Sequence, residues 1–96
     1  MECRSFRFSR HAIERMFSRG IDPEAVKQIV LRGEEIASYA DDLPFPSCLV
    51  LGLIGSEPVH VVVARDPVSY LCIVVTVYRP DPKQWSEDFR TRRNRS

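Results

Sequence analysis

The chain has 96 residues, of which 44% are hydrophobic and 28% are charged, and its formal net charge is +1. This size suits one core and is too small for two, so we expect a single domain over residues 1–96. No stretch approaches the ~18 consecutive apolar residues of a membrane span, and Glu2, Arg4 and Arg7 stand where a signal peptide would be apolar. We therefore expect a cytoplasmic protein with no membrane association.

Two helices are predicted near the N-terminus, after a short edge strand over residues 3–8. Ser9 is a good N-cap and Gly20 a good stop, which predicts a helix from Arg10 to Arg19. Its apolar stripe consists of Ala12, Ile13, Met16 and Phe17, and a second stripe along its edge consists of His11, Arg15 and Arg19. Asp22 and Pro23 start a second helix, which Gly33 ends near Leu31 or Arg32.

The hydrophobic period changes after Gly33 from about 3.6 to 2, which indicates strands. We predict strands over residues 35–40, 48–54, 59–65 and 70–78, joined by short turns. Such turns require antiparallel neighbours, because a parallel pair needs a longer crossover. The predicted fold is α+β, with the two helices packed on one face of a four- to five-stranded antiparallel meander. Beyond residue 80, Trp85 and Phe89 could lie on one helical turn that packs back on the domain.

Alternation along these strands separates two faces of the sheet. The set expected beneath the helices is Leu49, Leu51, Leu53, Val59, Val61, Val63, Leu71, Ile73, Val75 and Val77. The opposite set is Val50, Gly52, His60, Val62, Ala64, Cys72, Val74, Thr76 and Tyr78. This second face is too polar for a core and too apolar for plain solvent, so we expect a groove or a partner's binding surface there.

The chain has three cysteines, Cys3, Cys48 and Cys72, with no C-x-x-C spacing. We expect buried free thiols rather than a disulfide framework or a cysteine zinc site. Two histidines would supply at best two metal ligands, so no metal and no cofactor are expected.

Charge is segregated along the chain. Residues 1–33 hold seven basic and four acidic side chains, residues 34–88 hold three and nine, and residues 89–96 add four arginines. Such a domain can hold an anion on one side and reject it on the other. The Arg-rich end at residues 89–96 is expected to be a flexible tail, and it either solubilises the chain or touches phosphate.

Four strings carry a family resemblance: His11-Ala12-x-x-Arg15-Met16, Tyr39–Asp42 with Pro44 and Pro46, Pro58-x-His60-Val61-Val62-Val63, and Thr76-x-Tyr78-x-Pro80 with Trp85. They resemble the uncharacterised family called domain of unknown function 4258, over about residues 6–93. The element order also resembles the RelE/ParE toxin superfamily, which includes messenger RNA endonucleases, ribosome-dependent or free, and gyrase inhibitors. A shared topology does not by itself transfer a reaction.

The toxin resemblance implies metal-free RNA cleavage, in which the 2'-hydroxyl attacks the adjacent phosphodiester. This reaction needs a base, an acid and cations near the phosphate. The candidate catalytic residues are His11, His60, Arg15 and Tyr78, and the candidate phosphate or RNA contacts are Arg19, Arg65, Arg79, Tyr39 and Thr76. RelE-like nucleases use Arg, Lys and Tyr rather than a histidine pair, and this chain departs from that pattern.

Other interpretations of these residues stay open. His11 and His60 can be structural or solvated, Arg15 can belong to a weak surface ion pair, and Tyr78 can be an aromatic at the edge of the core. Three functions follow: an RNA-acting enzyme or toxin that meets RNA or the ribosome, a noncatalytic module whose mixed sheet face docks an antitoxin or another protein, and a nucleic-acid-binding accessory protein that uses its Arg-rich ends. The first requires His11, Arg15 and His60 to converge on one groove.

Overall fold

Local capping sets the bounds of both helices in the computed structural model, which describes residues 1–93. The first strand, β1 (Ser5–Phe8), leads into α1 (Arg10–Arg19), where the Ser9 side chain accepts a hydrogen bond from the Ala12 amide. Gly20 ends α1 with φ of 65°, a conformation that glycine adopts at little cost. Helix α2 (Pro23–Arg32) starts from Asp22, whose carboxylate accepts from the Glu24 amide. The predicted helices are thus confirmed.

The strands after α2 form the predicted antiparallel meander. They are β2 (Glu34–Tyr39), β3 (Ser47–Ile54), β4 (Glu57–Arg65) and β5 (Leu71–Tyr78). At the far edge β1 pairs with β5 in parallel, so the order is β1-β5-β4-β3-β2. The prediction of a purely antiparallel sheet is therefore wrong. No hairpin joins β1 to β5, so nothing local requires them to run in opposite directions.

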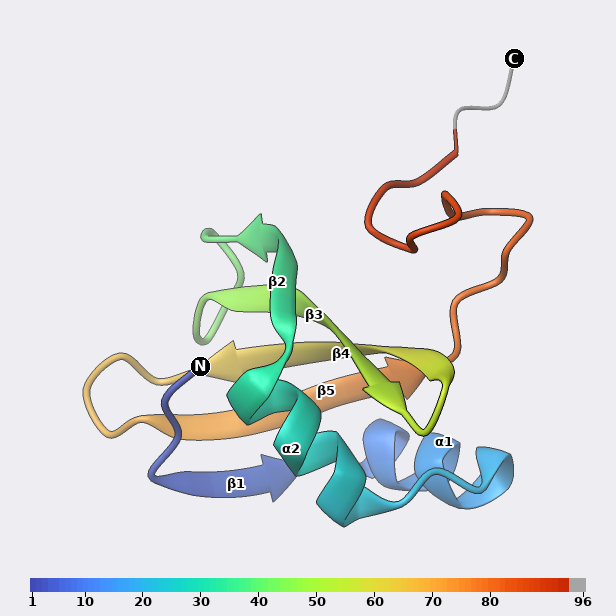
Figure 1. Cartoon of the computed structure of the whole chain (residues 1–96). Helices are drawn as coiled ribbons and strands as arrows, with labels where there is room; N and C mark the ends of the chain where they lie inside the picture. Colours follow the sequence, from blue (N-terminus) through green and yellow to red (C-terminus); the bar gives the residue numbers. More distant parts are fainter. Residues whose placement is uncertain (94–96) are drawn as a thin grey trace.

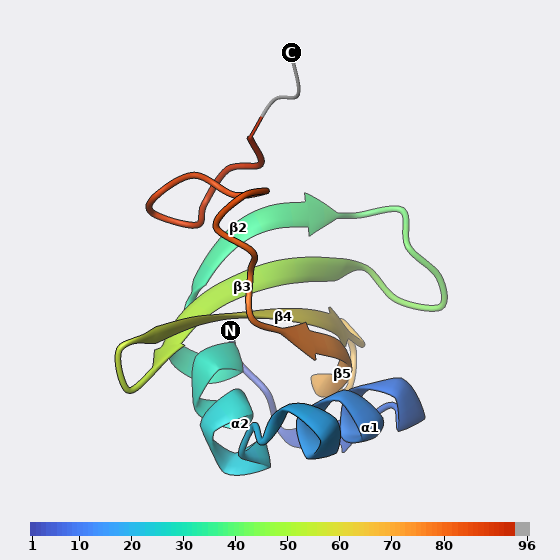
Figure 2. The same cartoon turned by 90° about the vertical axis from the view of Figure 1, so that its right-hand side faces the viewer.

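Both helices lie on one face of the sheet, and the segment after β5 lies on the other (Figure 1, Figure 2). We call these the helix face and the far face. In the described part of the chain, each helix has only ten residues, and no helix is long and apolar enough to cross a membrane.

The core fills the space between the helices and the sheet. Helix α1 contributes Ala12 and Met16, but Ile13 and Phe17 of its predicted apolar stripe are 54% and 91% exposed. Helix α2 packs directly against β3, because a Cβ atom on Gly52 would lie 2.6 Å from Ile29. Glycine at position 52 therefore permits this close approach.

The assignment of strand residues to the helix face is only partly confirmed. The buried cluster on this face takes Cys48, Val50, Val59, Val61, Val63, Cys72, Val74 and Val77 from the sheet. The prediction is right for β4 and for Val77. It is wrong for Leu49, Leu51 and Leu53, because Val50 pairs with the core residue Val61 and the three leucines alternate to the far face. In β5 the register shifts opposite Val62 and Val63, so Val75 has no partner in β4. The residues of β5 that precede Val75 therefore face the side of the sheet opposite to the predicted one.

A disulfide joins Cys3 to Cys72, whose Cα atoms are 5.6 Å apart, while Cys48 is a free, buried thiol. The expectation of three free thiols is therefore wrong. Spacing along the sequence could not reveal the pairing, because the parallel contact of β1 with β5 brings the two cysteines together.

The segment after β5, residues 80–93, folds back over the far face instead of extending from it. One turn closes where the Trp85 amide donates to the Asp81 carbonyl, and the Arg93 amide donates to the Gln84 carbonyl. Trp85 is only 7% exposed. The predicted packing of this aromatic side chain on the domain is confirmed, although no helix is formed there. The remainder of the predicted Arg-rich tail, residues 94–96, lies outside the described residues.

Candidate nucleic-acid interface

A row of basic side chains runs along the exposed side of α1. His11, Arg15 and Arg19 follow one another at intervals of four residues and line a shallow hollow together with Glu14 and Ser18. Residues spaced by four lie on one helix face, about 5–6 Å apart at their Cβ atoms. The row therefore spans about 12 Å along the helix axis, at 1.5 Å of rise per residue.

The arginines of this row are available for a ligand. Within residues 1–93, neither Arg15 nor Arg19 forms an ion pair, whereas Arg10 pairs with Glu14 at 3.2 Å. The helix is held firmly at its start, because the Ser9 hydroxyl donates to the Val75 carbonyl at 2.7 Å. At its end, Arg79 donates to the Arg19 carbonyl at 3.0 Å and pairs with Glu57 at 2.8 Å. Arg79 thus fixes the end of the row and has its charge partly neutralised.

His60 lies on the far face, buried under the segment after β5. Its Nε2 atom is 2.9 Å from the Phe89 carbonyl, and its Nδ1 atom is 3.2 Å from the Tyr78 hydroxyl. A carbonyl only accepts, so Nε2 carries the proton, and in the neutral ring Nδ1 accepts from Tyr78. The Trp85 ring packs edge-on against the imidazole with 4.4 Å between centroids. Both ring nitrogens are therefore occupied within the protein.

Burial sets the protonation of this pair. The pKa of His60 is lowered because burial disfavours the charged ring, and the bond to the Phe89 carbonyl opposes this in part. Burial likewise raises the pKa of Tyr78. The neutral imidazole and the neutral phenol are thus the stable forms at neutral pH. With His60 fully buried, this site is a structural hydrogen-bonded cluster rather than an open catalytic site.

The two histidines do not meet. Val59 and Val61 point into the core beneath the helices, so His60 between them points to the far face, where Tyr78 and Trp85 contact it. His11 lies on α1, on the helix face, and is exposed. The expectation that His11, Arg15 and His60 converge on one groove is therefore wrong, because the sheet separates them.

The other candidate residues fall into three places. Tyr39 and Thr76 share the far face with His60, since Tyr39 pairs with Ser47 and Thr76 with Val62, in register with that face. Arg65 lies on the helix face at the end of β4, where it donates to the Glu2 carbonyl at 3.2 Å. Only His11, Arg15 and Arg19 form an exposed group, and Arg79 touches its end.

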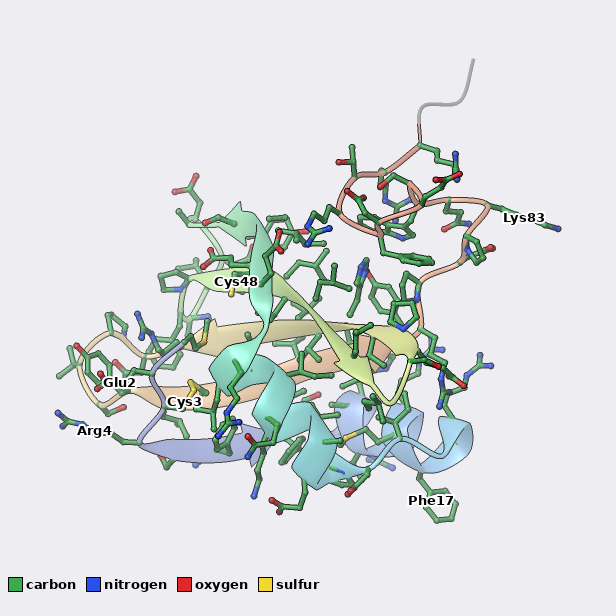
Figure 3. All side chains as sticks on the ribbon, in the orientation of Figure 1. Glu2, Cys3, Arg4, Phe17, Cys48 and Lys83 are labelled. Atoms are coloured by element: carbon green, nitrogen blue, oxygen red, sulfur yellow. A yellow bond between two sulfur atoms is a disulfide. The ribbon has the colours of Figure 1, made fainter. Side chains whose placement is uncertain are left out.

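The cover over His60 is the feature of this region that the sequence did not assign to a site. The Arg90 guanidinium donates to both oxygens of the Glu34 carboxylate, from Nε at 2.7 Å and from Nη2 at 2.8 Å. This pair attaches the segment to β2. Arg92 lies over the Trp85 ring at 5.3 Å. The signal in the sequence was the single tryptophan close to Phe89 after the last strand. Figure 3 shows Lys83 of this segment and Phe17 of α1 both projecting into open space.

The described residues contain no group of three His, Cys, Asp or Glu side chains that could hold a metal ion.

Comparison with known families places residues 8–79 in the domain of unknown function 4258 (DUF4258), and the chain belongs to this family. No curated protein and no solved structure matches the chain. The family match ends at Arg79, directly before the segment that covers His60.

Proposed function

We propose that this chain is an RNA-binding protein with a RelE/ParE-like fold, and that α1 holds the phosphate backbone through Arg15 and Arg19. The single observation that carries the proposal is the row on α1, where these two arginines are exposed and have no ion-pair partner within residues 1–93. Guanidinium groups bind phosphate oxygens through paired N–H donors, which makes arginine well suited to this role.

The neighbours of the row support the same proposal. His11 adds a ring donor to the hollow, and Glu14 is engaged by Arg10. With a net charge of only +1, the whole chain would attract nucleic acid weakly, so binding must depend on a local patch. The RelE/ParE-like part of the proposal is supported by the order of elements, in which β1, α1 and α2 precede a meander and both helices cover one face.

The proposal does not include cleavage by the histidine pair. A base and an acid that act on one phosphodiester must reach the same phosphate. His11 and His60 lie on opposite faces of the sheet, and His60 is covered by the chain itself.

The proposal is tested by fluorescence anisotropy with a labelled single-stranded RNA at several salt concentrations. Replacing both arginines, R15A/R19A, should weaken binding about tenfold or more, because the variant has no guanidinium in the row to bind phosphate. The slope of the logarithm of the binding constant against the logarithm of the salt concentration should also become less steep. The expected change is about 0.7 for each phosphate of the single strand that the variant no longer neutralises. The RNA should remain full length on a denaturing gel after the titration.

The matched control is R32A/K83A, which removes the same charge at the end of α2 and in the segment after β5. Both side chains are exposed and belong to neither the row nor the His60 cluster. This variant should bind as the parent does. Equal weakening in both variants would show nonspecific attraction and overturn the proposal, as would a parent protein that binds no RNA at low salt.

A further inference from the structure

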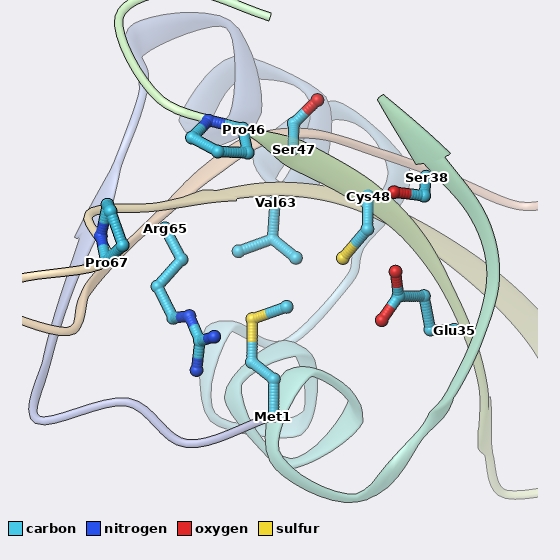
Figure 4. Close-up of a pocket in the computed structure, with 9 residues that line it drawn as sticks. All are labelled: Met1, Glu35, Ser38, Pro46, Ser47, Cys48, Val63, Arg65 and Pro67. Atoms are coloured by element: carbon cyan, nitrogen blue, oxygen red, sulfur yellow. The ribbon is translucent and has the colours of Figure 1, made fainter. Parts of the chain in front are cut away.

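A second hollow opens on the helix face near the ends of β2, β3 and β4, away from the row on α1. It has a volume of about 160 Å³, and Figure 4 shows the side chains that line it. Its floor is apolar and consists of Met1, Cys48 and Val63. A space of this size accommodates a small metabolite.

The register of the sheet places polar groups around this floor. Glu35 pairs with Val50 and Ser38 pairs with Cys48, and both partners belong to the core beneath the helices. The register shift between Glu35 and Ala37 allows both polar residues to share one face. Arg65, two residues after Val63, lies on the same face of β4.

Opposite charges face each other across the hollow. Figure 4 shows the Arg65 guanidinium on one side and the Glu35 carboxylate on the other, with Met1 between them. Within residues 1–93, neither group forms an ion pair. The guanidinium is held in place, because it donates to the Glu2 carbonyl at 3.2 Å and lies 5.0 Å from the centre of the Tyr70 ring.

The Cys48 thiol between these charges is part of the apolar floor and not a nucleophile. Burial and, after it, the Glu35 carboxylate raise the pKa of the thiol to about 11, while the N-terminal ammonium of Met1 and then Arg65 partly oppose the rise. The thiol therefore stays protonated at neutral pH. The hollow combines the Arg65 cation and the Glu35 anion with a neutral apolar surface, and the ammonium of Met1 nearby is engaged by the Val30 and Leu31 carbonyls.

We propose that this hollow binds a small zwitterion of the amino-acid class. The ligand's carboxylate accepts hydrogen bonds from Arg65, its ammonium donates to Glu35, and its short carbon chain lies over Cys48 and Val63. This site is separate from the row on α1, because its lining shares no residue with the hollow beside that row. A singly charged ligand would leave one of the two charges without a partner.

The test follows backbone amide shifts of the full chain by NMR during titration with β-alanine, 4-aminobutyrate and 5-aminovalerate. Butyrate and butylamine are the singly charged controls. At least one of the three zwitterions should shift the amides of Cys48 and Val63 and bind at least about tenfold more tightly than either control, since it forms charge-assisted bonds at both of its ends. E35Q should bring that zwitterion to the level of butyrate, and R65Q should bring it to the level of butylamine.

R32A serves as the control variant, because Arg32 is exposed and lies outside the hollow; it should bind the ligand as the parent does. E35Q keeps the proposal testable if R65Q unfolds, since Glu35 is exposed on β2 and its carboxylate forms no ion pair within residues 1–93 on which folding would depend. The proposal is overturned if no zwitterion shifts these amides up to its solubility limit. It is also overturned if butyrate binds the parent as tightly as the best zwitterion does.

Discussion

At the scale of single residues, His60 is the most constrained polar group on the far face. It is fully buried, and both its ring nitrogens lie within hydrogen-bond distance of partners that belong to the protein. A buried polar group without partners would destabilise the fold, whereas a fully satisfied one specifies how the surrounding segments pack. His60 therefore joins β4, β5 and the segment after β5 into one unit.

This burial makes stability depend on pH in a defined direction. Burial lowers the pKa of His60 in the folded protein below the ordinary value of 6.5. Well above pH 6.5 the ring is neutral in both the folded and the unfolded chain, and its contribution to stability is complete. As pH falls below that value, the unfolded chain takes up the proton first, so the free energy of unfolding decreases until the folded ring also protonates.

We therefore expect the parent to lose stability between about pH 7 and about pH 5, and H60Q to lose less over this range. Urea unfolding monitored by the emission of Trp85, the single tryptophan, measures both. H11Q changes an exposed histidine and should show the parent's dependence. Identical slopes for the parent and H60Q would show that this ring is not the titrating group.

The sequence could not decide between the structural and the catalytic interpretation of His60. A polar residue in an apolar strand needs a partner or solvent, and the partner here comes from Phe89, which is 29 residues away along the chain. By contrast, the exposure of His11, Arg15 and Arg19 followed from their position on one side of an amphipathic helix. Strand alternation had already placed His60 on the face opposite the helices, so the sequence itself argued against a groove shared with His11.

At the scale of elements, the bounds of the helices were predictable to within about one residue, whereas the faces of the sheet were not. Ser9, Gly20 and the Asp22-Pro23 pair act within a few residues of the helix ends, so their effect is visible in the sequence. The register shift at Val75 depends on how β5 meets β4, which no local pattern records. Strand alternation therefore predicted one face of β4 correctly and most of β5 incorrectly.

The disulfide is the second element-scale feature that depends on long-range pairing. It ties the segment before β1 to β5 across a sequence separation of 69 residues. Closing a loop of this length stabilises the folded chain by about 4 kcal/mol in the chain-entropy treatment. Reduction should lower the midpoint of urea unfolding in the parent, and C3S should match the reduced parent under either condition.

C48A provides the control for this experiment, because it alters a thiol outside the disulfide. It should respond to reduction as the parent does. Three free thiols in the denatured, unreduced parent would contradict the disulfide, as would unfolding midpoints that do not change on reduction.

At the scale of the whole molecule, the charge segregation in the sequence becomes a division between surfaces. The basic excess of residues 1–33 includes the row on α1, whereas Arg90 near the C-terminus is engaged by Glu34 and Asp88. The far face is covered by residues 80–93, so neither the groove nor the partner surface expected there is open at His60. The exposed cations of α1 therefore remain the best-supported surface for a polyanion.

The central claim is that RNA meets this chain at α1 and not at the His60 cluster. Amide and indole shifts of the isotope-labelled full chain, recorded by NMR during titration with single-stranded RNA, test it most directly. We predict the largest shifts within residues 10–19 and little change at His60, Tyr78 and the Trp85 indole. Large shifts at those three sites with α1 unchanged would contradict the account.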